Sequence, residues 1–441
     1  MPRHSTNRNV VSGDASALLH MPAVHLPTDL PAIAGGIPVR SLNEPLIFGV
    51  PTITSAEIES VSECLRSKWI GTGARVQRFE QEFARYKNAP YAVAVSSGTA
   101  ALHLAMVALG MGPGDEVIAP TMTFCATVHS IVHAGATPVL IDCERETCNL
   151  HPGEIEQRIS SRTKAIVVVH MAGRCCEMNV ILDIARRHRL MVIEDCAHAI
   201  ESTYHGRPAG LMGDAGCFSF YPTKSITTGD GGMVIARDAK LAHRIKLLSL
   251  HGMTSDAWSR TAPGKNSYQV VEAGYKCNMT DISAALGIAQ LAEVEARSRR
   301  REQIWNTYDR QLRELPLVLP AASDPRSRHA YHLYSVLIDT EALKIDRGRL
   351  AAAMAAENIG TGIHYVPVHM QPYYRQRYGF HPSDFPNASH IGRRTISLPL
   401  SAEMTEGDVS DVCEALTRVL RFYTKSVGNR GRSHKARAAA G

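Results

Sequence analysis

The sequence lacks any apolar run of the roughly 20 residues that a membrane-spanning helix requires. Its first forty residues also lack the continuous apolar core of a secretory signal. We therefore expect a cytoplasmic protein without a membrane span. At 441 residues, 44% of them hydrophobic, the chain exceeds one average domain and is able to bury a large core.

No CxxC pair occurs among the ten cysteines. They are scattered through apolar runs, and the adjacent Cys175 and Cys176 are poorly placed for ordinary bridging. Free thiols are therefore expected in place of a disulfide framework, which again favours a reducing compartment such as the cytoplasm.

Acidic residues are missing from the C-terminal tail, which supplies most of the net charge of +6. Lys425, Arg430, Arg432, Lys435 and Arg437 follow the last apolar helix pattern, and the rest of the chain carries about +1. A basic tail of this kind is more typical of a solvated chain end than of a docking arm. Nucleic acid is therefore not an expected partner.

The composition and hydrophobic periodicity of the sequence change along the chain, and these changes predict four zones. Residues 1–43 are Pro-rich and aperiodic, which indicates an irregular leader. Residues 44–299 alternate short β-branched runs with helical patterns, and residues 300–423 are typical of a smaller α+β domain. Residues 424–441 form the basic tail, which we expect to be disordered.

The alternation within the second zone predicts the fold class. The runs YAVAV, EVIAP and AIVVV are each followed by a helical stretch. Such βαβ units build a mostly parallel sheet that is buried on both faces. The expected fold is therefore α/β, with a large domain built on this sheet and a smaller α+β domain packed beside it.

A first candidate site lies in AVAVSSGTAALHLAMVALG. Here a strand at 91–95 turns through Ser97, Gly98 and Thr99 into a helix. Free backbone N–H groups and the helix dipole make such an N-terminus an anion site, and small residues let a phosphate approach the backbone. The alternative is an ordinary Ser/Thr helix cap.

A second candidate lies in MVIEDCAHAI, where a hydrophobic strand ends in Glu194 and Asp195, with His198 three residues on. Carboxylates at this end of a parallel strand lie where α/β sheets bind ligands. These residues do not have a regular metal-ligand spacing to other histidines or cysteines, so a metal site is not predicted. The sequence also lacks a GxSxG elbow, so a Ser/His/Asp triad is not predicted either. The alternative is an Asp that only caps the next turn.

The third candidate is Lys224 in FSFYPTKSITTGDGGMV, placed between a strand and a glycine-rich turn with almost no other charge nearby. A desolvated lysine loses part of its preference for the charged form, and its neutral amine is a nucleophile toward carbonyls. A lysine, an aspartate and a phosphate-binding helix end together fit one cofactor, pyridoxal phosphate.

At this point the chain resembles a known family. The resemblance rests on three stretches: SSGTAALHLAMVALGMGPGDEVIAPTMTFCATVHSI, IEDCAHAIESTYHGRPAGLMGDAGCFSFYPTKSITTGDGGMV and GYKCNMTDISAALGIAQL. They are similar to the DegT/StrS family of nucleotide-sugar aminotransferases and extend the likeness over roughly residues 44–422. The resemblance implies a fold-type I pyridoxal-phosphate enzyme, whose large domain holds a mostly parallel seven-stranded sheet.

The resemblance also implies roles for matching residues. Lys224 would form the covalent bond with the cofactor aldehyde and then move the proton between the cofactor and the amino-bearing carbon. Asp195 would pair with the pyridinium nitrogen, and Phe124 would stack on the ring face. His198 would reach the ring hydroxyl, where many relatives have Gln. The phosphate would be held by Gly98, Thr99 and Ser219.

Asn278 would, by the same resemblance, contact the phosphate of the neighbouring subunit in a homodimer with shared active sites. The alternative is a turn residue with local hydrogen bonds. Thr72 and His364 are candidates for the substrate side of the cleft, although His364 fits a buried structural role equally well.

The resemblance implies transamination of a UDP- or dTDP-linked 4-keto sugar with glutamate as donor, for surface polysaccharide or lipopolysaccharide biosynthesis. The UDP-4-amino-4-deoxy-L-arabinose branch, which serves lipid A modification, is the most similar. An amino-acid-directed aminotransferase would need an arginine for the substrate carboxylate, and Arg375 and Arg377 leave that alternative open. A non-catalytic regulatory member would be expected to lose Lys224 or Asp195, and both are present.

Overall fold

The computed structural model describes residues 29–261 and 267–425. Most of the predicted leader and of the predicted basic tail therefore lies outside the described residues. Among the helices of these two ranges, none combines the length and the apolarity needed to cross a membrane.

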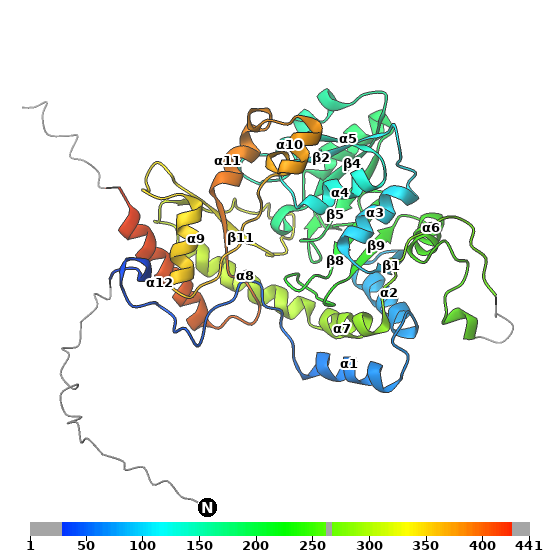
Figure 1. The fold of residues 1–441 in the computed structure, drawn as a ribbon, viewed down its shortest axis with the longest axis horizontal. Coiled ribbons are helices and arrows are strands. Elements are labelled where there is room, and N and C mark those ends of the chain that lie inside the picture. Colours follow the sequence, from blue (N-terminus) through cyan, green and yellow to red (C-terminus); the bar gives the residue numbers. More distant parts are fainter. Residues whose placement is uncertain (1–28, 262–266, 426–441) are drawn as a thin grey trace, which may run out of the picture.

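A seven-stranded sheet forms the centre of the larger part of the molecule (Figure 1). Its strands lie in the order β1-β9-β8-β5-β4-β2-β3. Strand β9 is antiparallel to both neighbours, and the other pairs are parallel. This confirms the predicted sheet. The strands are β1 Tyr91–Val95, β2 Glu116–Pro120, β3 Thr137–Ile141, β4 Thr163–Val169, β5 Met191–Asp195, β8 Ala215–Ser219 and β9 Gly232–Ala236.

Helices cover both faces of this sheet because its side chains alternate between two buried cores. On β1, Val93 and Val95 belong to one core and Ala94 to the other. Burial on both faces is what a mainly parallel sheet requires. The first core includes side chains of α3 Gly98–Ala108, α4 Cys125–His133 and α6 Ala239–Ser249. The second includes side chains of α2 Ala74–Lys87, α5 Met178–His188 and α7 Asp281–Ala292, and α1 Ser55–Arg66 packs on α7.

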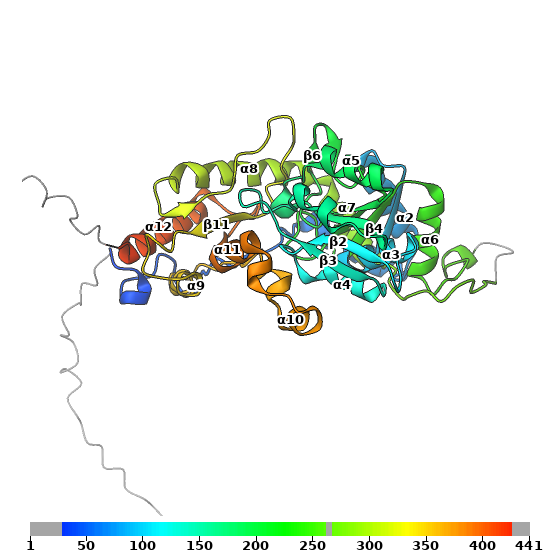
Figure 2. The ribbon, with the colours of Figure 1, turned by 90° about the horizontal axis from the view of Figure 1, so that it is seen from above.

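A three-stranded antiparallel sheet forms the centre of the smaller part, on the left in Figure 1. Three helices share a third buried core with it, and in Figure 2 the long α8 bridges the two parts. The sequence predicted a smaller α+β unit here, and the antiparallel arrangement of its strands is supplied by the structure. Its elements are β10 Leu317–Val318, β11 Tyr334–Ile338 and β12 Thr395–Leu398, with α8 Val294–Gln311, α9 Arg347–Ala356 and α12 Glu406–Tyr423.

The described part of the predicted leader packs against this smaller part. The backbone N–H groups of Ala32 and Val39 donate hydrogen bonds to Glu357 at 2.7 and 2.9 Å, and Arg40 pairs with Asp408. The buried Glu357 carboxylate therefore holds residues 29–43 in place. The domain division at residues 43, 299 and 423 stays a prediction.

Shorter elements connect these units, and all ten cysteines, which lie within the described ranges, are free. The prediction of free thiols is therefore confirmed. The remaining elements are β6 Thr203–Tyr204, β7 Arg207–Pro208, α10 Pro372–Tyr378, α11 Pro386–Arg394 and the 3-10 helices Ala32–Ala34, Pro152–Glu154, Glu156–Arg158, Met171–Gly173, Ser259–Thr261, Val368–Met370 and Pro382–Asp384.

Candidate active site

A cavity of about 450 Å³ opens where β1, β5 and β8 end. The carboxyl ends of the strands in an open α/β sheet are where such folds bind ligands. The cavity brings together side chains from segments that are far apart in the sequence. Eight of the ten predicted site residues line it: Gly98, Thr99, Phe124, Asp195, His198, Ser219, Lys224 and His364.

Lys224 lies on the loop that joins β8 to β9. Its backbone N–H donates to the carbonyl of Tyr221 at 2.9 Å, and Phe220 N–H donates to the carbonyl of Gly231 at 2.9 Å, so the loop folds back on its own base. Burial lowers the pKa of the Lys224 ammonium to about 8, and the Asp195 carboxylate opposes this shift. A nucleophilic neutral amine is therefore accessible close to neutral pH.

In the cofactor-free protein, acylation of Lys224 is expected to follow a pH midpoint near 8. Asp195→Asn removes the opposing negative charge and should move this midpoint lower. Peptide mass spectrometry after timed labelling at a series of pH values measures both midpoints. Labelling that keeps rising up to about 10.4, where an ordinary lysine titrates, would contradict the assignment.

Asp195 is the last residue of β5 and is 5% exposed. Its Oδ2 accepts a hydrogen bond from Thr127 Oγ1 at 2.7 Å, and its Oδ1 accepts one from the backbone N–H of Ala197 at 3.1 Å. Burial raises the pKa of this carboxyl, and the two hydrogen bonds oppose the rise. A buried carboxylate held at both oxygens is suited to pair with a cationic ring nitrogen.

The start of α3 combines the predicted anion site with the helix cap that was its alternative. Ser97 Oγ accepts a hydrogen bond from the backbone N–H of Ala100 at 3.0 Å, so the cap alternative is correct for Ser97. The next two residues, Gly98 and Thr99, line the cavity, and no described residue accepts a hydrogen bond from their backbone N–H groups. These two donors, at the positive end of the helix dipole, are available for a phosphate.

A side chain at position 98 would fill this cradle. A β-carbon built on Gly98 would lie 2.7 Å from Cβ and 3.0 Å from Oγ of Ser219. Gly98→Ala should therefore displace Ser219 from the phosphate position and raise the cofactor Kd by about tenfold or more.

The control for this substitution is Gly112→Ala, where a β-carbon would meet nothing within 4 Å. Titration of each cofactor-free variant with pyridoxal phosphate, followed by absorbance, gives the two Kd values. Equal losses in both variants would mean that the contact with Ser219 does not control binding.

Aromatic side chains form another wall of the cavity. Phe124 is 56% exposed, and its ring centroid lies 5.8 Å from that of Tyr365. His198 Nε2 lies 3.0 Å from Tyr365 Oη, and His198 Nδ1 accepts the backbone N–H of Ala172 at 3.3 Å. The Phe124 ring is thus open to a flat partner, whereas both ring nitrogens of His198 already have protein partners.

His364 combines the two roles considered for it. Its Nδ1 lies 2.8 Å from Ser397 Oγ, which ties it to β12, and its ring also lines the cavity. Burial, together with the charge of Lys224, lowers its pKa to about 4, so the ring is neutral at physiological pH. A neutral, fixed imidazole offers a hydrogen bond to a ligand but no charge.

Thr72 and Asn278 do not line the Lys224 cavity of the same chain. They border a separate cavity of about 140 Å³, where Asn278 Nδ2 donates to Thr72 Oγ1 at 2.6 Å and Lys276 Nζ donates to Asn278 Oδ1 at 2.6 Å. Within one chain these two predicted residues therefore lie together, apart from the other eight.

Comparison with known proteins supplies the family. The model of the DegT/DnrJ/EryC1/StrS aminotransferase family matches residues 51–417. The chain belongs to this family. It is 45% identical over 386 residues to the spore coat polysaccharide biosynthesis protein SpsC of Bacillus subtilis, covering 87% of this chain and 99% of SpsC.

Solved structures of similar proteins show the same architecture. The putative sugar aminotransferase Spr1654 of Streptococcus pneumoniae, in its PMP form, superposes with a TM-score of 0.81 at 32% identity, covering 86% of this chain and 99% of its own. DesI, solved in the presence of its TDP-sugar product, has a TM-score of 0.78 at 31% identity, covering 89% and 96%. These neighbours confirm the fold-type I assignment.

This DegT-family chain is therefore a pyridoxal-phosphate-dependent aminotransferase of a sugar aminotransferase family. The residues present fit the cofactor. An amine whose pKa is lowered to about 8, a carboxylate held at both oxygens and an anion site that a single β-carbon would fill all border one cavity. They match the cofactor's aldehyde, ring nitrogen and phosphate.

Sequence reasoning missed two residues of this DegT-family site. Thr127, which holds Asp195, lies one helical turn after Phe124 in the same MTFCAT motif, and that spacing was a usable signal. Tyr365 directly follows His364, but no sequence pattern distinguishes its phenol from that of any other half-buried tyrosine. Its partner His198 is 167 positions away.

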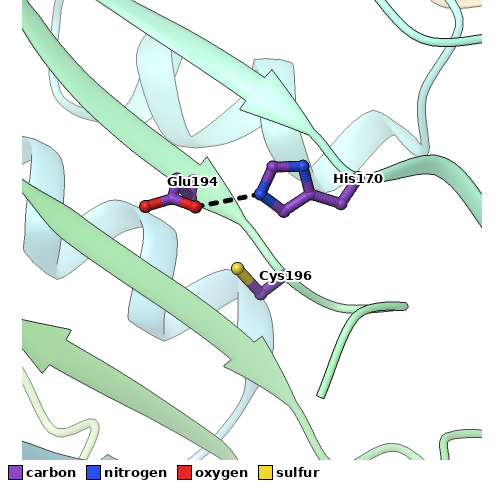
Figure 3. A group of neighbouring side chains, drawn as sticks. All are labelled: His170, Glu194 and Cys196. Carbon is purple, nitrogen blue, oxygen red and sulfur yellow. Dashed lines mark hydrogen bonds and ion pairs between the residues drawn. The ribbon is translucent and has the colours of Figure 1, made fainter. Parts of the chain in front are cut away.

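A cluster of possible metal ligands lies behind the site, formed by His170, Glu194 and Cys196 (Figure 3). His170 Nδ1 accepts the backbone N–H of Cys176, so its Nε2 carries the proton and donates to Glu194 at 3.0 Å. Glu194 also accepts three hydrogen bonds from the backbone N–H groups of Gly210, Met212 and Gly213. These hydrogen bonds explain the cluster as a buried anchor for the end of β5.

Proposed function

We propose that the protein transfers the amino group of glutamate to a nucleotide-linked 4-keto sugar in the cytoplasm, for surface polysaccharide or lipopolysaccharide biosynthesis. The observation that carries this proposal is the meeting of Lys224, Asp195 and the α3 anion site in one cavity. The relatives support a sugar acceptor, because SpsC serves spore coat polysaccharide and DesI was solved with a TDP-sugar product.

Each side chain of the site has a part in this reaction. Pyridoxal phosphate, when bound, supplies the carbonyl that takes up the amino group in one half-reaction and releases it in the other. Lys224 Nζ, with its pKa lowered to about 8, accepts and returns protons near neutral pH. With the cofactor bound, Asp195 would hold positive charge at the ring nitrogen. Phe124 would cover the ring and exclude water from it.

Our proposal for the sugar and its nucleotide rests on sequence resemblance. The stretches HGMTSDAW, GYKCNMTDISAALG and IGTGIHYVPVHMQPYY are similar to the 4-amino-4-deoxy-L-arabinose branch. A UDP-linked 4-keto pentose, used for lipid A modification, is therefore our first candidate. Related UDP- and dTDP-linked 4-keto hexoses follow, and the TDP-sugar of DesI supports including them. His364 is proposed to face this substrate.

The amino-acid-directed alternative needs a guanidinium for the substrate carboxylate. Arg375 and Arg377 lie on α10, are exposed, and do not line the Lys224 cavity. Among the residues that the structure describes, no arginine lines that cavity. The alternative therefore lacks its main recognition group within one chain.

The deciding experiment supplies the holoenzyme and glutamate with a panel of UDP- and dTDP-linked 4-keto pentoses and hexoses. Mass spectrometry of each amino sugar, with stoichiometric 2-oxoglutarate, identifies acceptor and donor together. Turnover of free keto acids without turnover of any nucleotide sugar would disprove the proposal.

The proposed homodimer makes a separate prediction, because Asn278 is assigned to the partner's phosphate. Lys224→Ala and Asn278→Ala chains, each inactive alone, should regain up to about one quarter of wild-type activity when refolded together in equal amounts. Half of the dimers would then be mixed, and each mixed dimer would hold one intact site. No recovery, with mixed dimers verified by mass spectrometry, would place Asn278 outside the shared site.

A further inference from the structure

A second, smaller cavity shares Lys224 with the cofactor cavity. Its volume is about 40 Å³, which gives room for about three water molecules. The Lys224 loop between β8 and β9 forms one wall. Arg297 and Arg301 form another, and both lie on α8, the helix that bridges the two parts of the molecule (Figure 2). The cavity therefore lies between the bridging helix and the loop that carries the reactive amine.

Both arginines are buried and keep unpaired donors. Arg297 is 8% exposed and Arg301 is 5% exposed. Nη2 of Arg297 donates to Glu57 at 2.8 Å, and Nη2 of Arg301 donates to Glu201. Among the described residues, Nε and Nη1 of both arginines have no acceptor, and Arg297 Nη1 and Arg301 Nε are fully buried. A buried donor without a partner costs free energy, so these nitrogens need an acceptor.

The charged groups around the cavity are all basic. Arg297, Arg301 and Lys224 line it, whereas no carboxylate of the described residues does. Burial, together with the charges of Lys224 and Arg301, holds the pKa of the lining His332 well below its usual range, so this ring is neutral. Water both donates and accepts hydrogen bonds, whereas an anion only accepts them. Unpaired guanidinium donors in positive surroundings therefore favour an anion.

We propose that this cavity is a binding site for a small monoanion, held by the unpaired guanidinium donors of Arg297 and Arg301. The volume limits the ligand to a halide ion or a single carboxylate group. Two sources share this chemistry, namely inorganic chloride and a carboxylate of the amino donor. In either case the anion joins α8 to the Lys224 loop.

Anomalous diffraction from holoenzyme crystals soaked in sodium bromide locates the site directly and needs no variant. We expect a bromide ion in the cavity, within hydrogen-bond distance of a guanidinium nitrogen of both Arg297 and Arg301. Bromide found only on the protein surface, with water alone in the cavity, would overturn the proposal.

Chloride should also raise the Tm of the holoenzyme along a saturating curve, because the site exists only in the folded protein. The expected rise is about 3 °C at a chloride concentration of about 100 times the Kd. Sodium gluconate, whose anion is too large for the cavity, keeps the ionic strength constant. An equal Tm in the two salts at every concentration would count against an anion site.

Two conservative variants test the assigned donors. Arg297→Lys and Arg301→Lys keep a positive charge beside Glu57 and Glu201 but lose the planar set of guanidinium donors. Each should raise the half-saturating chloride concentration by about tenfold or more.

Arg300→Lys is the matched control for these variants. Arg300 lies on the same helix and binds the carbonyl of Met404 and the carboxylate of Glu406, but it does not line the cavity. Its replacement should leave the chloride dependence unchanged. The same chloride dependence in all three variants would mean that Arg297 and Arg301 do not hold the anion.

The two sources are separated by steady-state kinetics of the holoenzyme with glutamate, and this measurement alone rests on the proposed function. If a carboxylate of the donor occupies the site, chloride should raise the KM for glutamate competitively and leave kcat unchanged. If the site belongs to chloride, the KM should not depend on chloride, and either result is consistent with the site. The bromide and Tm measurements use no substrate, so their failure would disprove the anion site and leave the proposed function standing.

Discussion

Lys224→Ala is expected to lower kcat for amino transfer by about 10⁴-fold or more. The substitution removes the amine that we propose bonds the cofactor and moves the proton, and proton transfer alone contributes about 10²- to 10⁴-fold. The purified variant should also lose the wild-type absorbance band, since the covalent link to the cofactor is gone. Steady-state amino-sugar production and absorbance spectra give the two readouts.

Two further variants separate chemistry from charge. Lys224→Arg keeps a positive charge but cannot release its proton near neutral pH, so its loss should match that of Lys224→Ala. Lys240→Ala removes an exposed lysine on α6 and should leave kcat unchanged. More than about one per cent of wild-type activity in Lys224→Ala would show that another group does the proton transfer.

Asp195→Asn has the second largest expected effect, a fall in kcat of about 10²- to 10³-fold. The amide keeps the shape of the side chain and still accepts the hydrogen bond from Ala197, but it lacks the negative charge that we propose pairs with the ring nitrogen. Asp183→Asn, on the exposed surface of α5, is the control and should have no effect.

The same substitution has an opposite effect on stability. Burial raises the folded-state pKa of Asp195 above its unfolded value. The stability that such a group contributes is full below the unfolded pKa and is lost as the pH rises through the folded pKa. At neutral pH the carboxylate therefore costs the cofactor-free protein stability. The Tm of cofactor-free Asp195→Asn should exceed that of the wild type, with the difference growing as the pH rises from 4 to 7. A lower Tm at pH 7 would contradict this.

Much of the fold and part of the site follow from local patterns. Strand Tyr91–Val95 is a continuous run without charge, and strand Met191–Asp195 begins with three apolar residues and ends in two carboxylates, so the end of each was predictable from the polar residues found there. Parallel strands place those ends at one edge of the sheet, which brought Gly98, Asp195 and Lys224 together as expected.

The remaining parts depend on contacts that no local pattern encodes. The hydrogen bond between Tyr365 and His198 joins positions that are 167 residues apart, and His198 also contacts the backbone N–H of Ala172. The positive φ of Ala172 had no sequence signal, because alanine rarely adopts it. Thr72 and Asn278 lie away from the cavity of their own chain, and their assignment to a partner's site stays a prediction.

The β8–β9 pairing has a consequence for how the enzyme acquires its cofactor. Ser219 pairs with Gly232 at the base of the Lys224 loop, so this loop closes between neighbouring strands and forms from short-range contacts. The phosphate site at Gly98, in contrast, lies 126 positions before Lys224 in the chain. It meets the loop only after β1 has paired with β9. A partly folded chain thus presents the reactive lysine before it is able to hold the phosphate. We expect pyridoxal phosphate to be captured late in folding and then to stabilise only the completed sheet.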